Sequence, residues 1–204
     1  MIGEKYRWPA ILLLTLCLLG GLIREVNAGE ETPLLVIDSI AGQFTQAIRD
    51  GHGNALAHSE GAFALLKPHF FRWEITAPGR QVIVSDGQYV WQHDQDLETV
   101  NQSALADMEA SPLAMLLEDE ETLSVAYEID RTPDSLTLRP RNPQRFFDAL
   151  TFRFADGVVT GLTIVDTVGQ IIDIELALDP QTALTRDDFT FELPEGVDFS
   201  GIES

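Results

Sequence analysis

The sequence predicts one predominantly β domain of about eleven short strands with two or three short helices. Three observations lead to this fold class. Turn signals rich in glycine, proline and aspartate separate short runs of alternating apolar and polar residues, helical periodicity is confined to a few places, and no repeat or low-complexity linker divides the chain. Closely spaced turns join alternating runs as antiparallel hairpins. A mainly antiparallel sheet is therefore expected.

The beginning of the chain has the features of a targeting segment. Two basic residues precede the apolar run PAILLLTLCLLGGLI, which is shorter than the about 20 residues that a membrane span requires. Small side chains near Ala28 fit a cleavage site, so residues 1–28 are predicted to be a cleaved signal peptide and residues 29–204 the mature domain. The alternative is an uncleaved anchor helix. Cys17 lies in the leader, so no disulfide or thiol chemistry is expected in the mature domain.

The mature domain is strongly acidic. The chain has 13 basic and 33 acidic residues. Three of the basic and two of the acidic residues lie in the leader, so the mature domain has 10 basic and 31 acidic residues and a formal charge of −21. Nucleic acids and anionic membranes are excluded as partners because both require a lysine- and arginine-rich surface. The charge suits a soluble protein that stays monomeric, and a solvated acidic surface and steering toward a basic partner both remain open.

Helices are predicted near 33–41 and 111–118. Their apolar residues recur at helical spacing, and a capping serine followed by proline marks the start of the second. The side chains that would face the sheet are Leu34, Ile37, Leu113, Met115, Leu116 and Leu117. Strands are predicted to follow, the first over 122–129 and the last over 188–193, with hairpin turns at Asp156-Gly157 and Val168-Gly169.

Residues 70–91 hold an unusual number of aromatic side chains. If Asp86-Gly87 is a two-residue hairpin loop, and Pro78-Gly79 closes the preceding turn, side chains of three strands alternate in register. One face is then polar and the other apolar. The predicted apolar face carries Phe71, Trp73, Ile75, Val82, Val84, Tyr89 and Trp91, and Phe63 and Leu65 are expected to extend it.

Two interpretations of this apolar face remain open at this point. The first is an ordinary core, in which helices or a second sheet cover the face completely. The second is a cavity, because the predicted helices are too few to fill a strongly curved sheet of about eleven strands. In the second case the two helices would form a lid over the cavity.

No catalytic or metal-binding motif is evident. The four histidines lack metal-ligand spacing, and nucleophile-elbow and phosphate-loop signatures are missing. A hydrolase would have to use His93, Asp94 and Asp96, which are better explained as turn and surface polarity. The sequence therefore predicts a protein that is not an enzyme and binds no metal.

Three segments together resemble a known family. GQFTQAIRDG, then the segment from Gly61 to Val100, and finally FTFELPEGVDF are similar to the bacterial outer-membrane lipoprotein carrier protein, the periplasmic LolA family. The resemblance implies a strongly curved, unclosed antiparallel β-barrel with short lid helices over an apolar cavity. It further implies a periplasmic chaperone that binds the acyl chains of lipoproteins and uses no cofactor. An inner-membrane ATP-driven lipoprotein-releasing complex would load it, and an outer-membrane lipoprotein receptor would unload it.

The resemblance also assigns roles to residues. Phe71, Trp73 and Trp91 match the family's aromatic cavity lining. The family usually has an arginine that latches the lid before the proline of the P-x-x-F-x-W segment, and this chain has Lys67 there. Lysine keeps the charge and loses the planar fork of donors, so a looser latch facing the lid is expected.

Other functions remain possible on the sequence alone. The same fold could carry another lipid or an apolar small molecule, and cavity chemistry would look similar. A periplasmic hydrolase and a structural protein with a filled core are the further alternatives.

Overall fold

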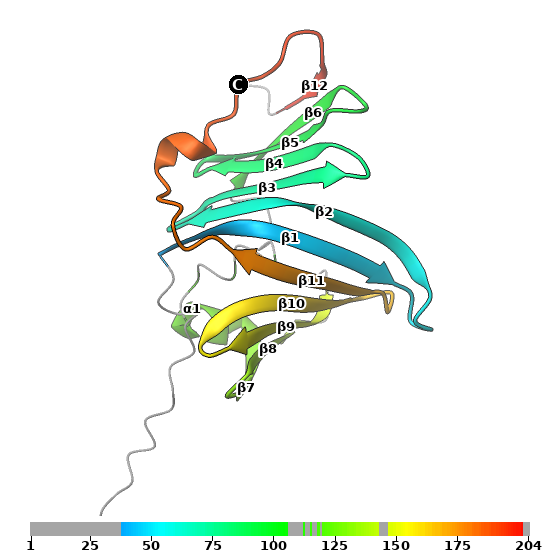
Figure 1. Cartoon of the computed structure of the whole chain (residues 1–204), viewed down its shortest axis with the longest axis vertical. Helices are drawn as coiled ribbons and strands as arrows, with labels where there is room; N and C mark the ends of the chain where they lie inside the picture. The colour runs from blue at the N-terminus through cyan, green and yellow to red at the C-terminus, as the bar shows by residue number, and fades with distance from the viewer. Residues whose placement is uncertain are drawn as a thin grey trace, which may run out of the picture.

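The computed structural model describes residues 38–105, 112, 115, 118, 120–142 and 147–201. This part of the chain forms a single curved sheet of twelve strands (Figure 1). The predicted signal peptide lies outside the described residues. None of the helices in the described part is long and apolar enough to cross a membrane.

The strands pair mainly with their neighbours in sequence, as expected for a meander. Their order across the sheet is β12-β6-β5-β4-β3-β2-β1-β11-β10-β9-β8-β7, so the ends of the row, β12 and β7, do not pair and the sheet is unclosed. Only β12 lies parallel to its neighbour β6. The bounds are β1 (Ser39–Arg49), β2 (Ala55–Leu66), β3 (Phe70–Ala77), β4 (Gln81–Asp86), β5 (Tyr89–Asp94), β6 (Thr99–Ala104), β7 (Tyr127–Thr132), β8 (Ser135–Pro140), β9 (Phe147–Ala155), β10 (Val158–Asp166), β11 (Ile171–Leu178) and β12 (Asp198–Ser200).

The later hairpins turn where the sequence predicts. Asp156 and Gly157 have φ angles of 50° and 76°, as the tight turn between β9 and β10 requires, and Gly169 has a φ of 82° between β10 and β11. The left-handed backbone favours glycine at positions 157 and 169 because a side chain crowds the backbone there, and aspartate is one of the few other residues that tolerate it, as at Asp156.

The helix predicted near 33–41 is wrong for its second half. Ser39 begins β1, and Ile40 pairs with Leu65 of β2, so long-range pairing overrides the local helical spacing. Leu34 and Ile37 lie outside the described residues. Most of the helix predicted near 111–118 lies outside them as well, including Leu113, Leu116 and Leu117.

Two strand predictions are also wrong. Residues 122–126, predicted as the start of a strand, belong to α1 (Glu120–Ala126), where two acidic residues occupy the first turn and Leu123 is buried. Residues 188–193, predicted as the last strand, instead include the end of η4 (Arg186–Phe189) and an extended segment after it. The last strand is β12, further along the chain.

Glycines allow β1, β2 and their neighbours to approach closely. Gly61 pairs with Phe44, and Gly42 pairs with Phe63, so an aromatic ring lies opposite a bare backbone in each pair. A Cβ atom at Gly61 would collide with the carbonyl oxygen of Glu74 and would lie 2.9 Å from the Phe44 ring. Strands β1 and β2 therefore depend on glycine at these close approaches.

The two faces of the sheet bury different clusters. The inner face, defined by Phe44, Trp73, Leu138 and Leu162 and the side chains in register with them, carries the main core. This core joins residues of β3 to residues of β8, which stand six places apart in the sheet order, so the inner face is the concave one. The outer face carries a smaller cluster of Val82, Val84 and Phe189.

Candidate apolar binding site on the inner face

The inner face is a continuous apolar surface built from alternate residues of most strands. Cross-strand pairs continue it from β2 through β1, β11 and β10 to β8, because paired residues point to the same face. Its buried members include Phe44, Phe63, Leu65, Phe71, Trp73, Leu136, Leu138, Leu150, Phe152, Leu162 and Ile174. No polar side-chain atom buried in the described part of the molecule lacks a hydrogen-bond partner.

Aromatic rings stand at the centre of this face. Phe44 stacks on Trp73 with ring centroids 3.6 Å apart and planes inclined by 21°, and Phe63 lies 6.0 Å from the same indole. On the other side of the sheet's curve, Tyr127 and Phe147 stack at 5.9 Å. These rings supply large apolar area with few rotatable bonds.

Five predicted cavity residues do lie on the inner face. Phe63, Leu65, Phe71 and Trp73 are buried there, and Ile75 packs against them while partly exposed. The expected extension of the face by Phe63 and Leu65 is confirmed, because Phe63 pairs with Trp73 and Leu65 with Phe71. Met115, a predicted lid residue, is buried in the same cluster.

Four predicted cavity residues lie on the opposite face: Val82, Val84, Tyr89 and Trp91. The predicted register is wrong between β3 and β4, where Trp73 pairs with Ile83 instead of Val84. Ile75 pairs with Gln81, so an odd number of residues, 76–80, forms the connection and inverts the alternation. Val82 and Val84 consequently point outward, together with the residues of β5 that they face.

The outward aromatic residues are covered by the C-terminal segment. Trp91 stacks on Phe191 with centroids 5.1 Å apart and lies 6.3 Å from Phe199. Phe189 is fully buried against Val82 and Val84, and its ring lies 5.8 Å from that of Phe70. The strands that the aromatic residues of FTFELPEGVDF contact therefore have an apolar outer face.

Asp86 organises the β4–β5 hairpin. Register places the two-residue loop at Gly87-Gln88, one position later than predicted, with Ser85 opposite Val90. The Asp86 carboxylate accepts hydrogen bonds from the Tyr89 N–H at 2.7 Å and the Trp91 Nε1–H at 3.0 Å. Burial opposes ionisation of Asp86, but these hydrogen bonds outweigh it and hold the pKa of the carboxyl below its ordinary value.

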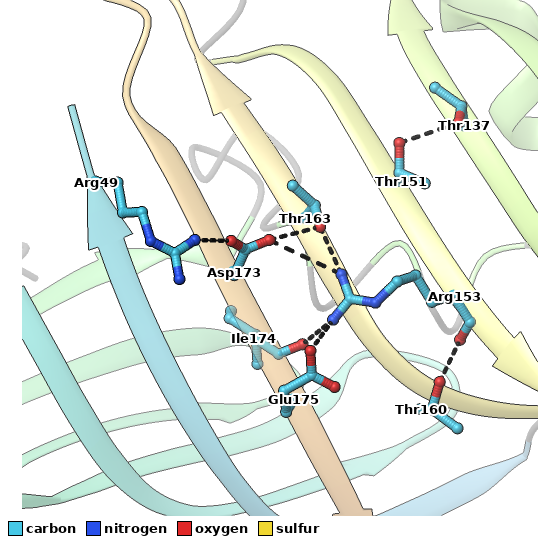
Figure 2. Close-up of polar contacts among 9 residues, drawn as sticks. All are labelled: Arg49, Thr137, Thr151, Arg153, Thr160, Thr163, Asp173, Ile174 and Glu175. Carbon is cyan, nitrogen blue, oxygen red and sulfur yellow. Dashed lines mark hydrogen bonds and ion pairs between the residues drawn. The ribbon is translucent and has the colours of Figure 1, made fainter. Parts of the chain in front are cut away.

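The outer face of β8–β11 and β1 is polar (Figure 2). The Arg153 guanidinium contacts Glu175 at 2.6 Å and donates to the Ile174 carbonyl oxygen at 3.1 Å. Asp173 accepts from Arg49 at 2.6 Å and from the Thr163 hydroxyl at 2.8 Å. Sequence reasoning missed this network, which makes the outer side of these strands mainly polar.

The hydrolase candidates do not converge. His93 packs edge-on against Phe191 on the outer face. Asp94, its neighbour, points to the other face and accepts from the Asp96 and Leu97 N–H groups. Asp96 accepts from Arg80. Nor does the described part of the molecule hold three histidine, aspartate or glutamate side chains placed to bind a metal.

A pocket of about 310 Å³ opens at the edge of the inner face. It lies between the start of β1, the β9–β10 turn and the end of β11, and Ile40, Val159 and Leu178 of the inner face contribute to its lining. Part of the inner face thus borders a surface pocket at this edge.

Lys67 lies at the same end of the sheet, in the β2–β3 turn. Its backbone N–H donates to the Asp38 carbonyl oxygen at 2.8 Å, and its side chain is half-buried. Within the described residues its ammonium forms no ion pair. The lid residues that it is expected to contact lie mostly outside that part, so the latch stays a prediction.

An unclosed, curved sheet with a continuous apolar and aromatic inner face defines a class of protein suited to apolar ligands. Residues 36–192 match the family described as "Outer membrane lipoprotein carrier protein LolA". The chain is 32% identical over 207 residues to the outer-membrane lipoprotein carrier protein of Chromohalobacter salexigens, covering 96% of this chain and 97% of the relative. The chain therefore belongs to the LolA family.

A second curated relative agrees with this assignment. The outer-membrane lipoprotein carrier protein of Alkalilimnicola ehrlichii is 35% identical over 165 residues, which cover 79% of this chain and 77% of the relative. Among solved structures, a LolA superfamily protein from Nitrosomonas europaea aligns with a TM-score of 0.47 and 11% identity, over 76% of this chain and 90% of that one.

Proposed function

We propose that this protein is a periplasmic chaperone that binds the acyl chains of lipoproteins and carries them to the outer membrane. The observation that supports this function most directly is the continuous apolar inner face in a chain of the LolA family. The polar outer side of β8–β11 and β1, with a formal charge of −20 on the whole chain, suits a carrier that stays dissolved while it holds lipid.

The free-energy cost of moving acyl chains out of a membrane is large. Each buried methylene group is worth about 0.8 kcal/mol, so a protein with several acyl chains does not leave a membrane unaided. An apolar surface with few directional contacts holds the chains and still releases them. The energy for extraction must then come from a partner. We infer that an inner-membrane ATP-driven complex loads the protein and that an outer-membrane receptor unloads it.

The inner face supplies the proposed acyl-chain site. Of the residues predicted from sequence, Phe63, Leu65, Phe71, Trp73 and Ile75 remain in this role, and Phe44 joins them through its stack with Trp73. The protein is proposed to act as a monomer, without catalysis.

A lid is proposed to cover the acyl-chain site. Met115 supports the lid, because it is buried in the inner-face cluster although it comes from the segment between β6 and α1. The other proposed lid residues are Leu34, Ile37, Leu113, Leu116 and Leu117. Lys67 is proposed as the latch, supported by its half-buried side chain beside the start of β1.

Native mass spectrometry of the protein purified from periplasmic extract tests the function. A synthetic triacylated lipopeptide should form a one-to-one complex, and the same peptide without acyl chains should not bind. Failure of the lipopeptide to bind would overturn the proposal. Co-purified phospholipid or fatty acid that the lipopeptide does not displace would identify a carrier of another lipid.

A further inference from the structure

The inner face changes from apolar to polar across four neighbouring strands. One row of cross-strand partners runs from Trp73 in β3 to Ile83, Gln92 and Asn101 in β4, β5 and β6. The row on one side runs from Phe71 through Ser85 and the buried Val90 to Ser103, so only its last strand adds a polar side chain beyond Val90. The row on the other side runs from Ile75 through Gln81 and Asp94 to Thr99 and is polar from β4 onward. Side chains of direct partners stand about 5 Å apart, so this change occurs within the reach of one bound molecule.

The exposure of the side chains in the first row increases in the same direction. Trp73 is buried, Ile83 is half-buried, and Gln92 and Asn101 are exposed. Within the described part of the molecule, neither amide side chain makes a hydrogen bond, so their donors and acceptors are available to a ligand. Amides offer both donors and acceptors without charge, which suits ester and peptide groups.

We propose that cargo binds in one orientation, with its acyl chains toward β1–β3 and its ester linkages and first peptide residues on the polar band of Gln92 and Asn101. This inference rests on the proposed function and adds a direction to it. An acyl chain placed over the band would cover amides without satisfying their hydrogen bonds, which is unfavourable. A peptide placed over Trp73 would leave its own backbone groups unpaired in the same way.

Site-specific photo-crosslinking tests the orientation. A benzophenone amino acid replaces Trp73 at the apolar end of the row, Asn101 at its polar end, or Gln43, an exposed amide residue on the outer face of β1, as the control. Each variant is irradiated with the triacylated lipopeptide, and mass spectrometry locates the attachment within the ligand. Adducts should lie on the acyl chains for Trp73, on the peptide or glycerol part for Asn101, and be missing for Gln43.

The outcomes separate the two proposals. Acyl adducts at both Trp73 and Asn101, or a reversed pattern, would overturn the orientation and keep the acyl-chain site. Loss of adducts at both positions, in variants with wild-type circular dichroism, would overturn the proposed function itself.

A second measurement does not depend on the crosslinker. Gln92→Leu and Asn101→Leu should each lower the preference for the lipopeptide over a free fatty acid by about two- to tenfold, the value of one lost hydrogen bond. Gln43→Leu should leave this preference unchanged. An unchanged preference in both band variants would contradict the assigned role of the amides.

Discussion

Asp86 shows how a single carboxylate fixes a hairpin. Its hydrogen bonds to Gln88, Tyr89 and Trp91 join the loop backbone to the indole that the C-terminal segment covers. The residue therefore links the turn of β4–β5 to the packing of the outer face.

Removal of this carboxylate should destabilise the protein in a pH-dependent way. Asp86→Ala is expected to lower the free energy of unfolding by about 1–3 kcal/mol at pH 7, because it leaves donors unpaired. Since the folded-state pKa of Asp86 is lowered, its contribution is present above the unfolded-state pKa of about 3.9 and is lost as pH falls through the folded-state pKa. Urea unfolding at pH 7 and pH 3 should show the difference between wild type and variant shrinking. A constant difference would contradict the prediction.

Gly61 is a second residue on which the sheet depends. Gly61→Ala is expected to lower the free energy of unfolding by about 2–4 kcal/mol, because the new methyl group meets the backbone oxygen of Glu74 and must displace a strand. At Gly79 a Cβ atom would lie 3.3 Å from the movable Asp96 side chain. Gly79→Ala is therefore the control, and thermal unfolding should rank the two variants in this order.

At the scale of elements, turn residues and the alternation of apolar and polar side chains predicted most strands. The prediction of which face a side chain lies on was limited by connections whose length the sequence does not fix. The Asp156-Gly157 turn was predictable because its chemistry fixes its length. The five residues 76–80 do not fix a register, so the predicted positions of Val82 and Val84 were on the wrong face. The α1 helix was missed because a short helix depends on tertiary contacts, here the burial of Leu123.

The C-terminal segment acts as an element that covers the outer face. Phe189→Ala should lower the free energy of unfolding by about 3–5 kcal/mol, because the ring is fully buried against β3 and β4. Leu193→Ala, at a side chain that is 47% exposed, should change it by less than about 1 kcal/mol. Thermal melts of both variants check this, and equal losses would show that the segment is held by some other contact.

At the scale of the molecule, the two faces are proposed to have separate tasks. The candidate site could be predicted in part, since Phe71 and Trp73 lie inward as expected. The opposite half of the inner face, from β7 to β10, was not assigned from sequence, because its pairing with the first half is set by long-range topology.

Substitutions of two isoleucines, one on each face, test the proposed tasks separately. Ile75 lies on the inner face and Ile171 on the outer face, and both are partly exposed. Ile75→Glu is expected to weaken lipopeptide binding at least about tenfold, because a charge must be desolvated beside the acyl chains. Ile171→Glu should leave the affinity within about twofold. Fluorescence titration measures both, and equal affinities would show that the inner face is a filled core.

The unclosed sheet has a mechanical consequence. Because β7 and β12 end the row without meeting, the girth of the molecule can change through the twist and bend of each strand pair, with every interstrand hydrogen bond kept. A closed ring of strands lacks this freedom, since its circumference is fixed by strand number and stagger. The volume that the sheet encloses can therefore change. We expect the sheet to open to different degrees around cargo with two and with three acyl chains.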